Sequence, residues 1–312
     1  MRPRISLVIP CYNEEAVLPE TRRRLAVLLD QLAAEERIDP SSRVYFVDDG
    51  SRDRTWELIE RSSAEDARFG GIKLSRNCGH QYALLSGLLT AEGDVLISLD
   101  ADLQDDPDAI IAMLGAWRDG NEIVYGVRSQ RDQDSAFKRL TAHGFYSLMR
   151  RMGVDLVFDH ADYRLMSRRA IEFLREYPEI NLFLRGIVPL IGLRTTTVHY
   201  ARHERFAGES KYPLRKMLAF ALNGITSFSV VPLRMISILG LGTCFLSLAM
   251  VAWILVGRTM LDATIPGWAS TVIPTYFLGG VQLLSIGILG EYVAKTYMET
   301  KRRPRYFVEK VL

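Results

Sequence analysis

The stretch DVLISLDADLQDDP, residues 94–107, decides the fold class of this 312-residue chain. Residues 94–99 form a short and nearly continuous apolar run, which is typical of a strand buried on both faces. The run ends at Asp100, and Pro107 marks the start of a helix that we expect to stop near Gly120. A buried strand that leads through an acidic loop into a helix predicts one repeat of an α/β fold.

The same alternation of strand and helix extends along the chain on both sides of this stretch. Four further apolar runs are expected as strands: residues 5–9, 43–47, 72–74 and 122–127. Helical spacing of apolar residues is expected between them, over residues 14–32, from about Asp53, and over residues 80–89. The alternation predicts a mainly parallel sheet that is covered by helices on both faces.

Polar clusters follow three of the expected strands. They are CYNE at residues 11–14, DDGS at residues 48–51 and DAD at residues 100–102. Sheets of this type bind their ligands outside the carboxyl ends of the strands. We therefore expect the three clusters to meet at one edge of the sheet and to form the functional site there.

The acidic cluster is expected to hold a metal ion. Asp100 and Asp102 are two residues apart, so in extended backbone both carboxylates face one side, and Gln104 has the same parity. Oxygen ligands suit Mg²⁺ or Mn²⁺, and Mg²⁺ typically shares one or two carboxylates with substrate phosphates. The cluster thus predicts a diphosphate ligand. The alternative is a solvated acidic loop, because further aspartates follow closely.

Composition and motifs argue against several other functions. The 39 Lys and Arg residues nearly balance the 37 Asp and Glu residues, so a general nucleic-acid binder is not expected. Three widely separated cysteines suit a reducing cytoplasm and exclude a disulfide scaffold. The first expected strand is not followed by G-x-G-x-x-G, and the chain has no G-x-x-x-x-G-K-[ST]. These absences disfavour a dinucleotide oxidoreductase and a P-loop NTPase.

The last third of the chain contains two uncharged runs, residues 235–257 and 263–290. As a helix, either run is long enough to span the roughly 30 Å of a bilayer core. Lysines and arginines flank the pair on its outer sides, whereas the short loop between the runs holds only Arg258 and Asp262. The positive-inside rule then predicts a transmembrane hairpin with both chain termini in the cytoplasm. The alternative is a pair of buried core helices.

Successive motifs resemble those of the inverting glycosyltransferases of family 2, which have a GT-A fold. They are SLVIPCYNEE (6–15), VDDGSRDRT (47–55), LSRNCGHQYAL (74–84) and LDADLQDDP (99–107). Later motifs resemble the membrane-anchored polyprenyl-phosphate glycosyltransferases, especially the bactoprenol glucosyltransferase group. These are ADYRLMSRRA (161–170), ERFAGESKY (204–212), GITSFSVVPLRM (224–235) and LGEYVAKTY (289–297).

The resemblance implies a domain organisation and an activity. We expect a cytoplasmic GT-A (Rossmann-like) domain over residues 1–210, an amphipathic juxtamembrane region over 211–233, the hairpin over 234–295 and a cytoplasmic tail over 296–312. The implied reaction is a metal-dependent, inverting single displacement at the inner face of a bacterial-type plasma membrane. It transfers glucose from UDP-glucose to undecaprenyl phosphate. The expected partners are a nucleotide sugar, a lipid phosphate and the membrane. A homo-oligomer is a further possibility, because glycine-rich faces in the apolar runs would let helices pack closely.

The resemblance also implies roles for individual residues. Nucleotide-sugar binding is expected of Pro10, Tyr12, Glu14, Asp48, Asp49 and Asp100. Metal binding is expected of Asp100, Asp102 and Gln104, and acceptor-phosphate binding of Arg128, Arg205 and Lys211. The expected catalytic residues are Asp102 and Asp162, where Asp162 matches the proposed general base of the family.

Alternatives remain open at Asp162 and at the neighbouring residues His80 and Gln81. A phosphate monoester has its second pKa near about 6 and is mostly dianionic at neutral pH, so we expect Asp162 to position a substrate rather than to remove a proton. The alternative is a structural Asp162 that pairs with Arg164 or Arg168. His80 and Gln81 stand at an expected helix start, where they either cap the helix or contact substrate.

Two other activities compete with glucosyl transfer. Ala161 and Tyr163 stand where the glucosyl group usually has Gly and Phe, so another sugar on the same lipid is an alternative: 4-deoxy-4-formamido-L-arabinose, GlcNAc or mannose. A membrane-tethered nucleotide-sugar binding module without catalysis is the second. It would usually lack the acidic pair, and the presence of Asp100 and Asp102 argues against it.

Overall fold

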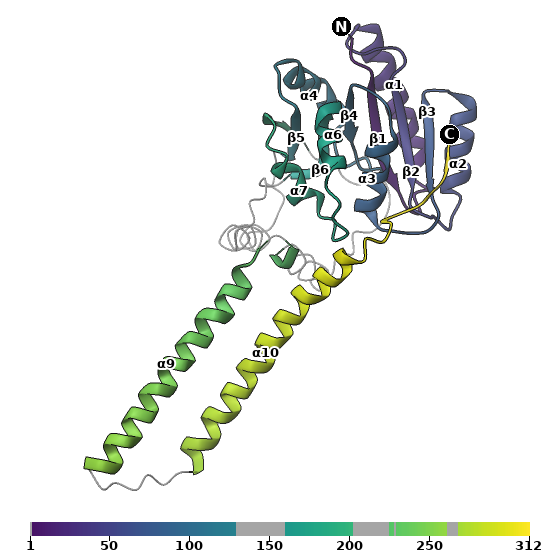
Figure 1. The fold of residues 1–312 in the computed structure, drawn as a ribbon. Coiled ribbons are helices and arrows are strands. Elements are labelled where there is room, and N and C mark those ends of the chain that lie inside the picture. The colour runs from purple at the N-terminus through teal and green to yellow at the C-terminus, as the bar shows by residue number, and fades with distance from the viewer. Residues whose placement is uncertain (1, 129–159, 202–224, 228, 261–267) are drawn as a thin grey trace. The chain divides into compact units, whose positions relative to one another are not determined.

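The computed structural model describes residues 2–128, 160–201, 225–227, 229–260 and 268–312. It divides into two compact units. One holds a β-sheet, its flanking helices and the C-terminal residues 302–312, and the other holds two long helices, α9 and α10 (Figure 1).

An eight-stranded sheet forms the centre of the first unit, in the order β7-β5-β6-β4-β1-β2-β3-β8. The strands are β1 (Ile5–Cys11), β2 (Arg43–Asp48), β3 (Phe69–Leu74), β4 (Val95–Ser98), β5 (Ile123–Arg128), β6 (His160–Ser167), β7 (Thr195–Tyr200) and β8 (Val308–Val311). Only β6 and β8 run against the other six. The five expected strands are present, and the prediction of a mainly parallel sheet is confirmed.

Helices cover both faces of the sheet, as predicted (Figure 1). They are α1 (Leu18–Ala34), α2 (Thr55–Glu65), α3 (His80–Thr90), α4 (Ala109–Arg118), α6 (Arg168–Arg175) and α7 (Leu184–Leu190). The main core packs α1 and α4 against the strands, with Leu25, Ile9 and Met113 fully buried. On α3, a Cβ at Gly87 would lie 2.4 Å from the Val8 side chain, so α3 approaches β1 too closely for any larger residue.

Three strands were not expected from the sequence. The antiparallel β6 lies between β4 and β5, and its Arg164 is paired with both Ser98 and Tyr125. The edge strand β7 pairs with β5. Residues 296–312, expected as a tail, include β8, which pairs with β3 and places Leu312 against Gly71. Strand β6 carries two charged residues, and these conceal a buried strand from an analysis of apolar patterns.

The second unit consists of α9 (Val231–Met260) and α10 (Trp268–Thr300). Among the described residues, Phe277–Thr300 is the one helical segment long and apolar enough to cross a membrane, and α9 contributes a shorter apolar segment, Val231–Thr243. One of the two expected spans thus meets the requirements of length and composition. The second span stays a prediction, and most of the expected juxtamembrane region lies outside the described residues.

Candidate active site

The loops that follow β1 and β2 are joined to each other by hydrogen bonds. The Asn13 side chain accepts from the Arg52 N–H at 2.8 Å, and the Asn13 N–H donates to Ser51 Oγ at 2.9 Å. The Glu14 N–H donates to Thr55 Oγ1 at 2.8 Å. The first two polar clusters therefore meet at the carboxyl edge of the sheet, as predicted. Tyr12 and Pro10 belong to the same edge, Tyr12 exposed and Pro10 buried within β1.

Asp49 connects the second cluster to the start of α3. Its buried carboxylate accepts from the N–H groups of Cys78 at 2.7 Å and Gly79 at 2.9 Å. Burial raises the pKa of Asp49, although both hydrogen bonds favour its charged form. Gly50 has φ +68°, and a Cβ there would lie 2.6 Å from the Asn77 nitrogen, so this turn requires glycine. Each Asp49 oxygen already has a protein donor, which makes the residue a structural link as well as a candidate nucleotide ligand.

Asp48 is more deeply buried than its neighbour. One of its oxygens accepts from the Ser51 N–H at 3.2 Å, and the other has no hydrogen-bond partner in the part of the chain that the structure describes. Burial raises the pKa of Asp48 as well. The hydrogen bond within the turn indicates that Asp48, expected as a nucleotide-sugar ligand, shapes the turn that presents Asp49.

The acidic cluster lies after β4, but its backbone is not extended. Residues 101 and 102 form a turn, Leu103 has φ +57°, and the Asp102 carboxylate accepts from the Gln104 N–H at 3.2 Å. The argument from alternating side chains was therefore wrong, because alternation holds only in extended backbone. The placement of Asp100 and Asp102 at the strand end is as predicted. No three His, Cys, Asp or Glu side chains of the described residues form a ready metal cage.

Four elements bring charged side chains together around Asp162, which lies on β6. Arg164, from the same strand, donates to Asp162 Oδ1 at 2.6 Å. Arg185, from α7, donates to Oδ1 at 3.3 Å through Nε and to Oδ2 at 3.2 Å through Nη2. His80 Nε2, at the start of α3, lies 3.5 Å from Asp162 Oδ2 and 3.6 Å from Asp100 Oδ1. The cluster connects Asp162 directly to the acidic turn after β4.

These contacts set the charge states of the cluster. Burial alone would raise the pKa of Asp162, but His80, Arg185 and Arg164 together hold it well below its usual range. At Asp100, burial and the neighbouring carboxylates raise the pKa to about 6, even though His80 opposes the shift. Asp162 is consequently a permanent carboxylate at neutral pH and a weak base. At Asp100, burial and the neighbouring carboxylates disfavour the negatively charged form.

The structure decides between the alternatives at several positions. Asp162 pairs with Arg164 and not with Arg168, which donates to backbone carbonyls preceding β4. Neither His80 nor Gln81 caps α3, because its N-cap position is Gly79 and no side-chain cap bond is formed. Gln81 instead accepts from the Leu184 N–H at 2.9 Å, which ties α7 to α3.

Arg128 is the one predicted phosphate-binding cation that the structure describes, and it contacts other groups than this cluster. Arg128 donates to Asp105 at 3.1 Å and faces the Tyr200 hydroxyl at 3.4 Å. Buried Asp105 therefore offsets its charge. Arg205 and Lys211 lie outside the described residues. The analysis of the sequence did not find Arg185, since a single arginine in the apolar context NLFLRGIV carries no signal of its own.

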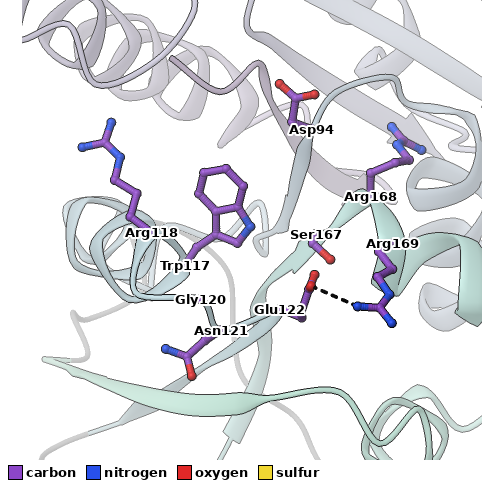
Figure 2. Close-up of a pocket in the computed structure, with 9 residues that line it drawn as sticks. All are labelled: Asp94, Trp117, Arg118, Gly120, Asn121, Glu122, Ser167, Arg168 and Arg169. Atoms are coloured by element: carbon purple, nitrogen blue, oxygen red, sulfur yellow. Dashed lines mark ion pairs between the residues drawn. The ribbon is translucent and has the colours of Figure 1, made fainter. Parts of the chain in front are cut away.

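A pocket of about 460 Å³ lies at the opposite edge of the sheet (Figure 2). Its walls come from the residues before β4 and β5, the end of α4 and the β6–α6 junction: Asp94, Trp117, Arg118, Gly120, Asn121, Glu122, Ser167, Arg168 and Arg169. Its arginines have protein partners; Arg169, for example, pairs with Glu122 at 3.7 Å. The pocket holds none of the predicted site residues.

Comparison with known proteins identifies the family of the chain. Residues 6–175 match Glycosyl transferase family 2. The chain is 50% identical over 310 residues to the "Uncharacterized glycosyltransferase YkoT" of Bacillus subtilis (strain 168), covering 99% of this chain and 92% of that protein. It is 37% identical over 308 residues to the "Bactoprenol glucosyl transferase" of Shigella phage SfX, covering 98% of this chain and 99% of the relative.

The chain is thus a glycosyltransferase. It belongs to glycosyl transferase family 2, which confirms the resemblance inferred from its motifs. Among solved structures, it is similar to glucosyl-3-phosphoglycerate synthase from Mycobacterium tuberculosis in complex with Mn²⁺, uridine-diphosphate and phosphoglyceric acid. That similarity has a TM-score of 0.49 at 19% identity and covers 72% of this chain and 76% of the other.

Proposed function

We propose that this glycosyltransferase transfers glucose from UDP-glucose to the phosphate of undecaprenyl phosphate at the cytoplasmic membrane face. The observation that carries the proposal is the match to the phage bactoprenol glucosyl transferase, which extends over nearly the whole of both chains. It includes the α9–α10 unit as well as the sheet. The apolar segment Phe277–Thr300 supplies a means of holding the enzyme at a lipid substrate.

The acidic turn fits a divalent cation. Asp100, Asp102 and Gln104 offer hard oxygen donors, and the crowding of negative charge that raises the pKa of Asp100 to about 6 is relieved by a bound cation. A Mg²⁺ or Mn²⁺ ion bound there would offset the charge of the departing nucleoside diphosphate. Two or three protein ligands suffice, because substrate phosphates and water complete the coordination of such ions.

The chain's own residues orient the two anionic substrates. We place the nucleotide against the joined loops after β1 and β2, with Tyr12 and Glu14 on one side and Asp49 on the other. An oxygen of the acceptor phosphate attacks the anomeric carbon from the face opposite the diphosphate, which leaves with inversion. Since the attacking phosphate is mostly dianionic near neutral pH, no proton has to be removed. Asp162, held by Arg164, positions a substrate and does not act as a base.

Arg128, Arg205 and Lys211 remain our proposed ligands of the acceptor phosphate. Arg128 and Asp105 are already hydrogen-bonded to each other. Arg128 therefore binds the acceptor phosphate only if the phosphate displaces Asp105. The charge-assisted bond that such an arginine forms to phosphate is strong enough to make the exchange feasible.

Transfer of labelled sugar into a lipid extract tests the proposal. The full-length enzyme in detergent is supplied with undecaprenyl phosphate and with UDP-glucose or other UDP- and GDP-sugars, each carrying radiolabel. We expect label from UDP-glucose to enter the lipid only with Mg²⁺ or Mn²⁺ present. Equal transfer after thorough chelation would contradict the metal role, and preference for another donor would contradict glucose.

Two matched variants test whether Asp102 binds the metal ion. Asp102→Asn is expected to reduce transfer at least 100-fold, because the amide carries no charge to bind the cation. Asp108→Asn, a change at an exposed aspartate six residues further on, should leave transfer within twofold of wild type. Equal effects of the two substitutions would mean that the acidic segment acts only through its total charge.

The glucosyl assignment is compatible with the Tyr163 difference. The Tyr163 side chain is fully buried, and its hydroxyl donates to the Asp106 carbonyl at 3.0 Å. The hydroxyl that distinguishes Tyr163 from phenylalanine is therefore used to fix the loop after β4. It does not by itself indicate a different sugar.

A further inference from the structure

A short basic segment, residues 302–307 (RRPRYF), joins α10 to β8. Lys301 directly precedes it, so four positive charges lie within five residues, and no acidic residue stands between Glu299 and Glu309. We propose that this basic segment binds the headgroups of anionic phospholipids at the membrane surface. The inference rests on the membrane location in the proposed function and is independent of the sugar and of the acceptor lipid.

Two arginines of the basic segment have no counter-charge within the protein. Arg302 and Arg303 are exposed, and neither forms a hydrogen bond or an ion pair with any residue in the described ranges. The exposed Arg61 differs in this respect, because it pairs with Glu65 on its own helix at 2.8 Å. A cation without a neighbouring carboxylate retains its full attraction for an external anion.

The backbone of Arg302 lies in the left-handed region, with φ +46°. Helix α10 ends at Thr300, and a left-handed residue just past a helix end is usually glycine, because a side chain is strained there. The chain has an arginine at a position where glycine would end the helix at a lower cost. Such an outlier points to a function of the side chain, and the charge of Arg302 supplies one.

The connection to α10 places these arginines close to the end of the apolar segment. The segment Phe277–Thr300 ends two residues before Arg302 and three residues before Arg303. Because one residue spans at most about 3.6 Å, both Cα atoms lie within about 11 Å of that end. The attraction of an anionic leaflet for cations extends over about one Debye length, roughly 10 Å. Both arginines are therefore within its range.

The other side chains of the segment favour a lipid surface over a soluble anion. Phe307 is 61% exposed, although its ring is large and apolar. Aromatic rings are enriched where a helix leaves the membrane, whereas a free phosphate ion would leave Phe307 in water. Four positive charges also exceed the two negative charges of a single phosphate monoester. The combination fits a surface of many anionic headgroups.

Contacts within the sheet unit hold the C-terminal end of the segment. Arg305 donates to the Tyr177 carbonyl, and the Phe307 carbonyl accepts from the Ser75 N–H at 3.0 Å. Strand β8 follows directly and pairs with β3. The cations thus belong to a short stretch that is anchored by hydrogen bonds, which reduces the entropy lost when it binds.

Spin-labelled lipids measure the binding in the full-length enzyme. The protein is reconstituted in phosphatidylcholine vesicles, and electron paramagnetic resonance compares its association with spin-labelled phosphatidylglycerol and with spin-labelled phosphatidylcholine. The test variant is Arg302→Gln/Arg303→Gln. Its matched control is Arg23→Gln/Arg61→Gln, which removes the same charge from exposed arginines that have carboxylate partners.

We expect phosphatidylglycerol to associate with the wild-type enzyme about twofold more strongly than phosphatidylcholine. High salt should remove most of this preference, because it screens exposed charges. Arg302→Gln/Arg303→Gln should lose most of the preference at low salt, and the control variant should keep it. An equal preference in the wild type and in Arg302→Gln/Arg303→Gln would overturn the inference.

Limited digestion with trypsin tests the unaltered chain. Trypsin cuts after Lys301 and Arg302, and cleavage after Arg54, whose side chain is 76% exposed, is the internal reference. In vesicles of equal parts phosphatidylcholine and phosphatidylglycerol, cleavage of the segment relative to Arg54 should be about fivefold slower than in phosphatidylcholine alone. Equal relative rates in the two kinds of vesicle would contradict headgroup binding.

Failure of the proposed function would give a different pattern. Neither measurement uses a substrate, so both remain valid if no glucose is transferred. If Arg302→Gln/Arg303→Gln raises the KM for undecaprenyl phosphate and leaves the lipid preference unchanged, the arginines bind the acceptor and the inference is wrong, whereas the proposed function stands. If the full-length enzyme does not float with vesicles, the membrane location and the inference fail together.

Discussion

The carboxylate of Asp162 lies 2.6 Å from the guanidinium of Arg164, and the two side chains are only 9% and 1% exposed. Both residues come from the central antiparallel strand β6, where alternate residues point to the same side. The pair makes Asp162, which the resemblance matches to the proposed general base of the family, a fixed negative charge. His80 and Arg185 both contact the Asp162 carboxylate of this pair.

The first prediction concerns Asp162→Asn. Because its neighbours hold the pKa of Asp162 well below its usual range, this group is ionised throughout the working pH range. We expect the substitution to lower kcat about 10- to 100-fold and to leave the shape of the pH profile of kcat/KM unchanged. If Asp162 were a general base, the substitution would lower kcat about 10²- to 10⁴-fold and would remove one limb of the pH profile of kcat/KM.

The control for Asp162→Asn is the stability of the variant. Removing one partner of a buried ion pair costs about 3–5 kcal/mol, so the thermal midpoint must be measured alongside the activity. Activity is to be compared at a temperature where both proteins are folded. A profile that loses its acidic limb in a folded variant would restore the role of base to Asp162.

The second prediction concerns metal affinity and pH. The pKa of Asp100 is raised to about 6 by burial and nearby carboxylates, so in the metal-free enzyme this group takes up a proton as the pH falls through about 6. The proton and the cation compete for the same oxygens. The apparent Kd for Mn²⁺ should be nearly constant above pH 7 and should rise up to about tenfold per pH unit below 6.

Calorimetric titration with Mn²⁺ at pH 5, 6 and 7.5 measures this dependence. Asp108→Asn serves as the control, since it removes a charge from the same segment without changing the proposed ligands. An affinity that is independent of pH from 5 to 7.5 would contradict a metal site built on Asp100.

The third prediction compares two helical glycines. A Cβ at Gly87 would lie 2.4 Å from Val8 and 2.7 Å from Val47, whereas a Cβ at Gly115 meets nothing within 4 Å. Gly87→Ala should therefore destabilise the sheet unit by about 1–3 kcal/mol through overpacking. Gly115→Ala should stabilise it by about 0.5–1 kcal/mol, because alanine is the better helix former. Thermal unfolding of the two variants tests the sign of each effect, and a stabilising Gly87→Ala would be inconsistent with this packing.

The fourth prediction concerns the C-terminal strand. Strand β8 covers the edge of β3, the Leu312 N–H donates to the Gly71 carbonyl at 2.8 Å, and Lys310 pairs with Glu60 at 2.7 Å. Deleting residues 308–312 should expose the edge of β3, lower the thermal midpoint and promote aggregation. Lys310→Ala is the control, because an exposed ion pair contributes at most about 1 kcal/mol. Equal midpoints for wild type and the deletion variant would show that β8 contributes nothing to the sheet.

The sequence by itself determined the alternation of strands and helices and the location of the polar clusters at strand ends. Both are local properties: an apolar run of four to seven residues predicts a buried strand, and acidic residues that directly follow it lie at the carboxyl edge of the sheet. DDGS and DAD were located correctly for this reason. The orientation of Asp102 was not, because the chain turns at residues 101 and 102 and the alternation on which the expectation rested does not extend to Asp102.

Only the tertiary structure decided which charges meet. Asp162 contacts His80 from 82 positions away and Arg185 from 23 positions away, and no periodicity in the sequence encodes either pairing. The strand that carries Asp162 was missed because a buried ion pair replaces the apolar side chains that usually reveal a central strand. Burial without neutralisation would be prohibitive for these charges, so their partners had to be supplied by folding, from elements distant in the chain.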